Sequence, residues 1–473
     1  MKLSKKALMA MALSGGVFLV GCGGNDTPEP VSQAVTPQEQ ASGPAQTEEA
    51  PVEENRRDLG GLEIVVANWW QDYRTDTFNP ATAHDEAVLN HRLAMEERYN
   101  FRVVERMVAG WDEYFEMVNT SIVAGDPVGH VVILNPAGFT PLMRQGMLSP
   151  LVGPSIDFND RSLVPWNNTI IDATSVNGVP YAFQPAYLMG PGIYWNMRLF
   201  EEAGLDPELP FDLLLAGEWT WDAFVEILRA NSRDTTNDGV IDIHAMASLG
   251  AWTLPGFVSS NMATFVGREP DGTFYNGTTS PEFFEALHFV QTLYNEGLIM
   301  SQPEGSAWNF FEEEFTNGRV AMTTGFMWHS QPHFGHMTDT IGFVPFPMGP
   351  AANQINMMAY DTFMTIPYQY SDIADDIMFA MTHWLTAPEG FNDPDAWISE
   401  FLPLFAHPRS VEEAMALFIR NQDYIQLAYH LFVPGYSYNE FFVWHMWGSG
   451  LDASTIIEQA QHQIEAVIAE VNN

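Results

Sequence analysis

Lysine and cysteine are nearly absent from this chain. Lys2, Lys5 and Lys6 are its only lysines. The chain after residue 6 therefore has no lysine for a phosphate-binding P-loop, a Schiff base or a Ser-Lys mechanism. Cys22 is the only cysteine, which excludes an intramolecular disulfide and a metal site built from cysteines. The motifs Gly-x-Ser-x-Gly and His-Glu-x-x-His are missing as well, which removes further routes to catalysis.

Positive charge is scarce throughout the chain. Its 473 residues include 60 acidic and 19 basic side chains, a formal net charge of −41. Such a surface repels nucleic acid and anionic membranes, so we expect no nucleic-acid partner. The lack of lysine has two explanations, and both stay open. The protein faces an alkaline or saline exterior, where arginine keeps the charge that lysine loses at high pH, or the composition of the chain has drifted. The length and the 46% hydrophobic content are enough for two or three domains.

The first 60 residues differ from the rest in composition. Residues 1–21 combine a basic start with an apolar run that is too short to span a membrane, which predicts a secretory signal. The signal ends Leu19-Val20-Gly21-Cys22, which resembles the lipobox of bacterial lipoproteins and implies a lipid on Cys22. An ordinary signal with an incidental cysteine is the alternative. Residues 22–60 hold this cysteine and a disordered, acidic linker, so we expect a protein anchored by lipid alone at the outer face of the cytoplasmic membrane.

From residue 61 onwards, apolar extended runs alternate with amphipathic segments. The pattern predicts strands at residues 62–67, 101–106 and 130–134, and helices at residues 85–99, 111–124, 221–230 and 281–297. This alternation is typical of an α/β fold with a doubly wound sheet that carries helices on both faces. The C-terminal third of the chain is predicted to be helical.

Three sequence blocks in the middle of the chain resemble a known family. They read Asn177-Gly178…Tyr181-Ala182, then Trp195-Asn196…Leu199-Phe200-Glu201-Glu202-Ala203-Gly204-Leu205-Asp206, then Thr220-Trp221-Asp222-Ala223-Phe224. In this order and spacing they resemble extracellular solute-binding proteins of carbohydrate-type ABC importers, the family of maltose-binding proteins. The segment from Phe315 to Trp328 resembles a further block of that family, with Arg319 in place of its usual lysine.

The resemblance implies an α/β, two-lobe periplasmic-binding-protein-like fold with a helical C-terminal part, its lobes joined by hinge crossings near residues 174 and 343. The N-lobe is expected at residues 61–173 plus 345–395, and the C-lobe at residues 174–343 plus 396–473. The resemblance also implies that a sugar or oligosaccharide binds in the cleft between the lobes and is delivered to the permease subunits of an ABC transporter. It implies no enzymatic reaction, and we expect a monomer.

Two other classes of function stay open. An extracellular glycosidase would need a pair of carboxylates across the cleft, about 5–5.5 Å apart for retention or roughly 6.5–9.5 Å apart for inversion. A peptide receptor stays open because aromatic clefts also bind peptides, and a metal-binding receptor would use three histidines that follow Trp328. The sequence measures none of these distances.

Aromatic and polar residues that follow predicted strands are the candidates for the ligand site, because ligands of open α/β sheets collect at the carboxyl ends of strands. Tryptophan faces stack on the C–H surface of a sugar, and polar groups reach its hydroxyls. Trp328 is the strongest candidate, because the resemblance implies an aromatic residue that faces ligand there, whereas core packing is the alternative for the pair Trp69-Trp70. The predicted ligand-binding residues are Trp69, Trp70, Asp72, Asn135, Tyr187, Trp252, Trp308, Trp328, Asp361 and Trp444.

An acidic segment after residue 233 has the opening of a calcium loop. Asp234, Asp238 and Asp242 stand at ligand positions, and Gly239 stands at the sharp turn. Ala245 occupies the position where such a loop needs a bidentate glutamate. A solvated turn held by its own aspartates is the alternative to calcium, and no other cofactor is expected.

Three histidines follow Trp328 at helical spacing. His329, His333 and His336 would share one face of a helix, which suits a zinc ion. Pro332 and Gly335 disfavour a regular helix there, and no acidic fourth ligand is evident. Hydrogen-bonded histidines at the surface or in the cleft are the alternative.

Overall fold

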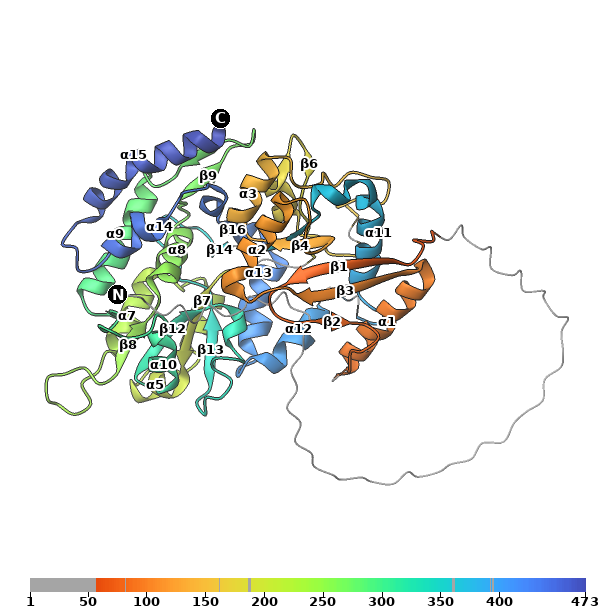
Figure 1. Cartoon of the computed structure of the whole chain (residues 1–473). Helices are drawn as coiled ribbons and strands as arrows, with labels where there is room; N and C mark the ends of the chain where they lie inside the picture. Colours follow the sequence, from red (N-terminus) through yellow and green to blue (C-terminus); the bar gives the residue numbers. More distant parts are fainter. Residues whose placement is uncertain are drawn as a thin grey trace, which may run out of the picture.

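The computed structural model describes residues 57–473 except 81, 161, 186–188, 360–361, 392 and 394. The predicted signal, Cys22 and most of the predicted linker lie outside these residues, and so do Tyr187 and Asp361. The predictions made for them therefore stay predictions. Figure 1 shows two separate sheets, one on the right and one at the lower left, each covered by helices.

The first sheet has the strand order β15-β4-β1-β3-β2. β1 pairs in parallel with β3 along its whole length and with β4 on its other side, while β15 lies antiparallel to β4. β4 is buried throughout and β1 is buried from Ile64 onwards, which explains why both read as continuous apolar runs. The strands are β1 (Leu62–Asn68), β2 (Tyr73–Arg74), β3 (Phe101–Met107), β4 (Val131–Leu134) and β15 (Phe363–Thr365).

Helices α1 and α11 pack together beside the first sheet. α1 begins at a capping box in which the Thr82 hydroxyl accepts from the Asp85 N–H and the Asp85 carboxylate accepts from the Thr82 N–H. Arg92 of α1 lies 3.6 Å from the ring centroid of Trp384 in α11. The helices of this lobe are α1 (Ala83–Tyr99), α2 (Trp111–Val123), α3 (Pro136–Arg144), α4 (Asn168–Ala173) and α11 (Ala374–Leu385), with the 3₁₀ helix η2 (Tyr368–Ile373).

The second sheet has the strand order β11-β8-β12-β7-β13. β11, β8 and β12 are parallel to one another, whereas β7 lies antiparallel to both β12 and β13. The strands are β7 (Gly192–Asn196), β8 (His244–Ala247), β11 (Ile299–Met300), β12 (Val320–Gly325) and β13 (Ile341–Val344). A separate antiparallel pair consists of β9 (Val266–Arg268) and β10 (Phe274–Asn276).

The helices of the second lobe begin at the caps that the sequence supplies. Thr220 caps α7, and Ser280 caps α9 with Pro281 in its first turn. The helices are α5 (Met197–Glu202), α6 (Leu209–Ala216), α7 (Trp221–Asn231), α8 (Gly250–Ser260), α9 (Pro281–Asn295) and α10 (Phe310–Thr316), with the 3₁₀ helix η1 (Met327–His329).

The chain passes from the first sheet to the second between β4 and β7 and returns between β13 and β15. On the first passage, β5 (Ser175–Val176) and β6 (Val179–Pro180) form a hairpin whose turn residues Asn177 and Gly178 have φ of 51° and 78°, as an Asn-Gly pair predicts. Phe183 then exchanges two hydrogen bonds of 3.0 Å with Met364 of β15. The predicted lobe boundaries stay predictions, although contacts to the first sheet continue beyond residue 174.

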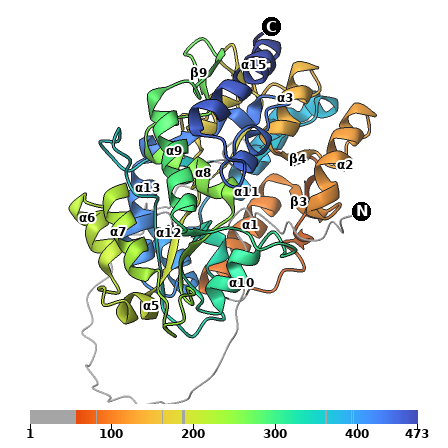
Figure 2. The same cartoon turned by 90° about the vertical axis from the view of Figure 1, so that its left-hand side faces the viewer.

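The C-terminal part is mainly helical and contacts both lobes. α15 packs on α9, as Figures 1 and 2 show, and also on β10. η6 packs on α3 of the first lobe and β9 of the second. β14 (Met357–Ala359) and β16 (Ile425–Leu427) form a short parallel pair. The remaining elements are α12 (Ala396–Phe401), η3 (Leu402–Leu404), the π-helix η4 (Ser410–Met415), α13 (Ala416–Arg420), η5 (Gln422–Tyr424), η6 (Tyr429–Phe432), α14 (Tyr438–Phe441), η7 (Val443–His445) and α15 (Ala453–Asn472).

The prediction of an α/β fold is confirmed, and the predicted helices at 85–99, 111–124 and 221–230 correspond to α1, α2 and α7. The predicted return crossing begins with β13, which is an edge strand of the second sheet, so the chain leaves this lobe only after Val344. Among the described residues, no helix combines the length and the apolar character needed to cross a bilayer.

Replacement of Trp195 by alanine is expected to destabilise the second lobe by about 3–5 kcal/mol, because it leaves a large cavity. The indole is fully buried, packs over Gly342 of β13 and donates to the Pro207 carbonyl at 2.8 Å. Urea unfolding followed by circular dichroism measures the loss. Leu215→Ala is the control, since Leu215 is 64% exposed, and a similar loss in both variants would contradict this account.

Candidate functional site

Three tryptophans follow the three parallel strands of the second sheet. Trp308 comes after β11, Trp252 after β8 and Trp328 after β12. Register pairs Met300 with Ala247, and Ala247 with Thr323, so the carboxyl ends of these strands meet at one edge of the sheet. This edge is where ligands of α/β sheets bind.

The tryptophans form one aromatic cluster at this edge. The Trp252 ring lies 5.4 Å from Phe311, 5.4 Å from Phe326 and 5.1 Å from His329. Trp328 stacks on His329 with ring centroids 3.7 Å apart. Trp308 packs in the same cluster as Trp252. The three tryptophans are half-buried, so each has an exposed part that a ligand can reach.

Two indole N–H groups of the cluster are unused. Trp308 Nε1 and Trp328 Nε1 are buried and have no hydrogen-bond partner among the described residues. A buried donor without a partner costs free energy, which a ligand that accepts the hydrogen bond recovers. Flat aromatic faces beside free donors suit a ligand with both C–H surface and hydroxyl oxygens.

Glu312 of α10 holds the segment that carries Trp328. His333 Nδ1 lies 3.0 Å from one carboxylate oxygen, and His329 Nε2 lies 3.6 Å from the other. His329 Nδ1 accepts from the Phe326 N–H at 3.0 Å, so the proton of this ring is on Nε2 and faces Glu312. Glu312 thereby hydrogen-bonds to His333 and lies beside His329, on which Trp328 stacks.

The electrostatics of this group follow from burial and from the two imidazoles. Burial opposes ionisation of Glu312, but His329 and His333 outweigh it and lower the pKa of the carboxyl from 4.5 to about 2. Burial lowers the pKa of His329, so its imidazole stays neutral near pH 7. Glu312 is therefore a carboxylate directly beside the tryptophan cluster.

The first lobe contributes a second aromatic cluster. Trp69 follows β1 and is only 3% exposed, with Trp70 at 4.9 Å and Trp111 at 5.0 Å in edge-on contact. The Trp69 ring is therefore packed in the core of this lobe, and the half-buried Trp70 is the more accessible of the pair. Trp69 Nε1 has no partner among the described residues.

The polar candidates of the first lobe support local backbone. Asp72 is exposed and accepts from the Met107 N–H at 2.9 Å. Asn135 follows β4 and caps α3 by accepting from the Gly138 N–H at 2.8 Å. Both lie after strands of the first sheet, and their role in ligand binding stays a prediction.

A small cavity of about 140 Å³ lies where the lobes meet. Trp252 and Pro255 of α8 line one side, and His430 of η6 and Tyr438 of α14 line another. η6 is tied to the first lobe because the Thr140 hydroxyl of α3 donates to the Phe432 carbonyl at 3.0 Å. We call this space the junction cavity.

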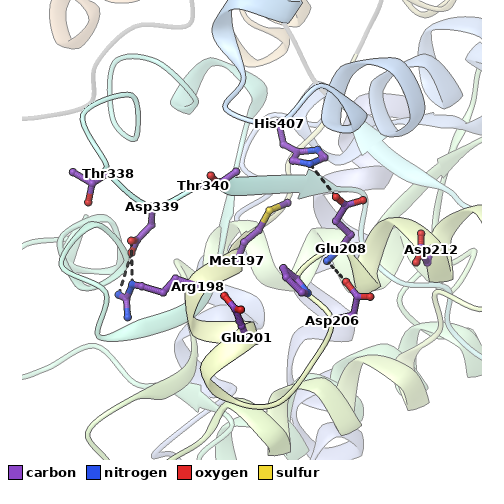
Figure 3. A pocket seen from close by; sticks show the side chains of 11 residues that line it. Met197, Arg198, Glu201, Asp206, Glu208, Asp212, Thr338, Asp339, Thr340 and His407 are labelled. Carbon is purple, nitrogen blue, oxygen red and sulfur yellow. Dashed lines mark hydrogen bonds and ion pairs between the residues drawn. The ribbon is translucent and has the colours of Figure 1, made fainter.

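A larger hollow of about 670 Å³ lies at the opposite edge of the second sheet, where β7 ends and β13 begins (Figure 3). Its carboxylates are largely engaged, since Arg198 donates to Asp339 at 3.0 Å and His407 lies 3.4 Å from Glu208. The tryptophan cluster is at the other end of these strands, because Gly192 of β7 pairs with Gly325 of β12. The hollow is therefore separate from the candidate site.

Not every predicted ligand-binding residue lies in the tryptophan cluster, and one residue that supports the cluster was not predicted. Trp444 is 63% exposed on η7, whereas Trp252, Trp308 and Trp328 converge. Sequence reasoning missed Glu312, which stands in a run of three glutamates, and no local signal distinguishes the buried member of such a run.

The aspartates of the acidic turn accept hydrogen bonds from its own backbone. Asp234 accepts from the N–H groups of Asn237 and Gly239 at 2.6 and 2.8 Å, and Asp242 accepts from the Thr235 N–H at 2.8 Å. The backbone N–H groups that donate to Asp234 lower the pKa of its carboxyl, and the one of Gly239 lowers it most. Asp238 accepts from the Val240 N–H at 2.8 Å, and calcium binding stays a prediction.

The three histidines do not share a helical face. η1 ends at His329, and His336 is exposed, while the rings of His329 and His333 lie 4.8 Å apart around Glu312. Within the described part of the chain, no group of three metal-ligating side chains is arranged to hold an ion. Hydrogen bonding to Glu312 is the role that the geometry gives to His333.

Comparisons with known proteins cover most of the chain. A family model described as bacterial extracellular solute-binding protein matches residues 100–390. This match confirms the resemblance drawn from the sequence blocks. No curated protein sequence matches the chain at a significant level.

Solved structures of similar fold cover most of the chain. A cyclic alpha-maltosyl-1,6-maltose binding protein from Arthrobacter globiformis has a TM-score of 0.62 at 15% identity, over 86% of this chain and 99% of that one. The maltose-binding protein MalE from Listeria monocytogenes, in complex with maltose, has a TM-score of 0.59 at 13% identity, over 87% and 98%. UgpB from Mycobacterium tuberculosis, in complex with glycerophosphocholine, has a TM-score of 0.59 at 15% identity, over 87% and 99%. The two-lobe fold is therefore confirmed.

Replacement of Glu312 by glutamine is expected to flatten the acid dependence of stability. The lowered pKa of Glu312 contributes stability above pH 4.5, and this contribution of roughly 3 kcal/mol is lost as the pH falls through 4.5 towards 2. The free energy of unfolding should therefore fall more steeply for the unmodified chain than for Glu312→Gln between about pH 5 and pH 3. Urea titrations at several pH values measure the slopes.

Glu313→Gln is the matched control, because Glu313 is the exposed neighbour on the same helix. It should keep the slope of the unmodified chain. Equal slopes for Glu312→Gln and the unmodified chain would contradict the stabilising role of the carboxylate.

Proposed function

The chain belongs to the bacterial extracellular solute-binding protein family, and we propose that it is a receptor that binds a carbohydrate between its lobes. The receptor is attached through a lipid on Cys22 at the outer face of the cytoplasmic membrane. It passes the intact sugar to the permease subunits of an ABC transporter. No bond of the sugar is made or broken.

The convergence of Trp252, Trp308 and Trp328 at one sheet edge carries this proposal. Aromatic faces bind the C–H face of a pyranose, and the free indole N–H groups of Trp308 and Trp328 donate to its hydroxyls. Two of the solved structures of similar fold are described as binding maltose or a cyclic maltosyl sugar, which agrees with this choice of ligand.

Closure of the lobes is the expected response to ligand. The chain crosses between two sheets, and a ligand that contacts both lobes favours the closed arrangement by the difference of its affinity for the two states. Trp70 is placed on the first lobe and Trp328 on the second, so one sugar chain held by both would stabilise closure. The closed form would be the one that the permease recognises.

The start of the folded body is fixed to the first lobe, which suits a tether. Arg57 donates to Asp375 of α11 at 2.7 Å and also bonds Asp376. Its guanidinium lies 4.6 Å from the ring centroid of Phe379. A linker ending here would pull on α11 and leave the second lobe free to move.

A thermal-shift screen of residues 57–473 against neutral oligosaccharides tests the proposal. A sugar that binds the folded state raises the melting temperature by mass action, about 2.7 kcal/mol of stabilisation at a hundredfold excess over Kd. The sugar should be recovered intact from every positive sample. Recovery of cleaved sugar would contradict the receptor function and indicate a glycosidase. The absence of any shift in melting temperature with sugars would contradict a carbohydrate ligand.

Trp328→Ala and Trp308→Ala are each expected to weaken binding about 10- to 100-fold, because each removes a stacking face and an indole donor. Isothermal titration with the sugar found in the screen measures the affinities. Phe284→Ala is the control, since this aromatic residue is 40% exposed on α9. Unchanged affinity in both tryptophan variants would contradict the assigned site.

A further inference from the structure

The junction cavity borders the tryptophan cluster. Ala251, Trp252 and Pro255 come from α8, and Ala428, His430 and Tyr438 come from the C-terminal part. Trp252 belongs to both places, because its ring also contacts His329 of the cluster. A ligand stacked on the cluster can therefore extend a substituent into this cavity.

The walls of the junction cavity are uncharged. Its volume of about 140 Å³ is less than that of a typical drug-sized pocket, so it fits a substituent rather than a whole oligosaccharide. None of the described residues that line it is acidic, arginine or lysine, although the chain has a net charge of −41. The Tyr438 hydroxyl is already used, since it donates to the Ala251 carbonyl at 3.1 Å.

His430 is a lining side chain with unused polar capacity. It is 3% exposed, and its Nδ1 is buried without a hydrogen-bond partner among the described residues. Phe265 and Tyr438 enclose the ring at 4.8 and 5.1 Å. Burial lowers the pKa of His430 to about 3, so the imidazole is neutral and offers one donor and one acceptor.

We propose that the junction cavity receives the acetamido group of an N-acetylated sugar, and this proposal rests on the carbohydrate function proposed above. The methyl group of the acetamide would lie against Pro255 and Ala428, and its amide would hydrogen-bond to His430. A plain hydroxyl leaves the apolar walls uncovered. A charged ammonium or carboxylate finds no counterion there, so amino sugars and sugar acids are disfavoured.

Isothermal titration of residues 57–473 with N,N′-diacetylchitobiose, called chitobiose below, and with cellobiose tests the proposal, because these two disaccharides differ only in carrying an acetamido group or a hydroxyl at C2 of each ring. Burial of one methyl contributes about fourfold and one hydrogen bond about fivefold, so chitobiose should bind about 20-fold more tightly. Maltose is included as a neutral sugar without acetamide. Equal affinity for chitobiose and cellobiose would overturn the assignment of the cavity while leaving the receptor proposal intact, and binding of none of the three would contradict both.

Two variants test whether the preference for the acetamido sugar arises in the junction cavity. Ala428→Met fills the cavity from its wall, and His430→Phe keeps the ring but removes both polar atoms. Each should reduce the ratio of the two affinities to about fivefold or less, and circular dichroism melting checks that each variant folds. Tyr368→Ala, at a 59% exposed aromatic residue, should keep the ratio of the unmodified chain. A ratio that survives in both cavity variants would overturn the proposal.

Discussion

The parallel pairing of strands is the constraint on which the rest of this molecule depends. Parallel neighbours bring their carboxyl ends to one edge, so residues far apart in the chain meet where the strands stop. In the second lobe, a tryptophan follows each of the strands β11, β8 and β12. In the first lobe, Trp70 follows β1 and Asn135 follows β4. A slip in the register of β8 against β12 would separate Trp252 from Trp328 and dismantle the cluster.

Charge is distributed very unevenly between the surface and the site. The surface carries most of the 60 acidic residues, whereas the junction cavity is neutral and the tryptophan cluster has a single buried carboxylate, Glu312. That carboxylate remains ionised because two imidazoles approach it, and it lies beside His329, on which Trp328 stacks. His430 stays neutral because aromatic rings surround it. The ligand site is therefore shaped by aromatic packing, while the acidic surface keeps the body away from anionic membranes.

Much of the fold was predictable from the sequence because local signals agreed with the final structure. The apolar runs of β1 and β4, the caps of α7 and α9, and the Asn177-Gly178 turn each specify their own segment. The site was predictable only in part. Trp328 and Trp252 were chosen because they follow strands, but the same reasoning chose Trp69, whose ring is buried among Trp70, Trp111 and Tyr114.

The sequence by itself determined the family, several of the strands and helices, and the exclusion of lysine and cysteine chemistry, because these depend on short-range patterns and on composition. Only the tertiary structure decided which glutamate of the run at residues 312–314 is buried, that His333 pairs with it, and that His430 lines a cavity shared with Trp252. Those relations join segments that are far apart in the chain. Burial and hydrogen-bond partners across such distances are set by packing, which no local pattern encodes.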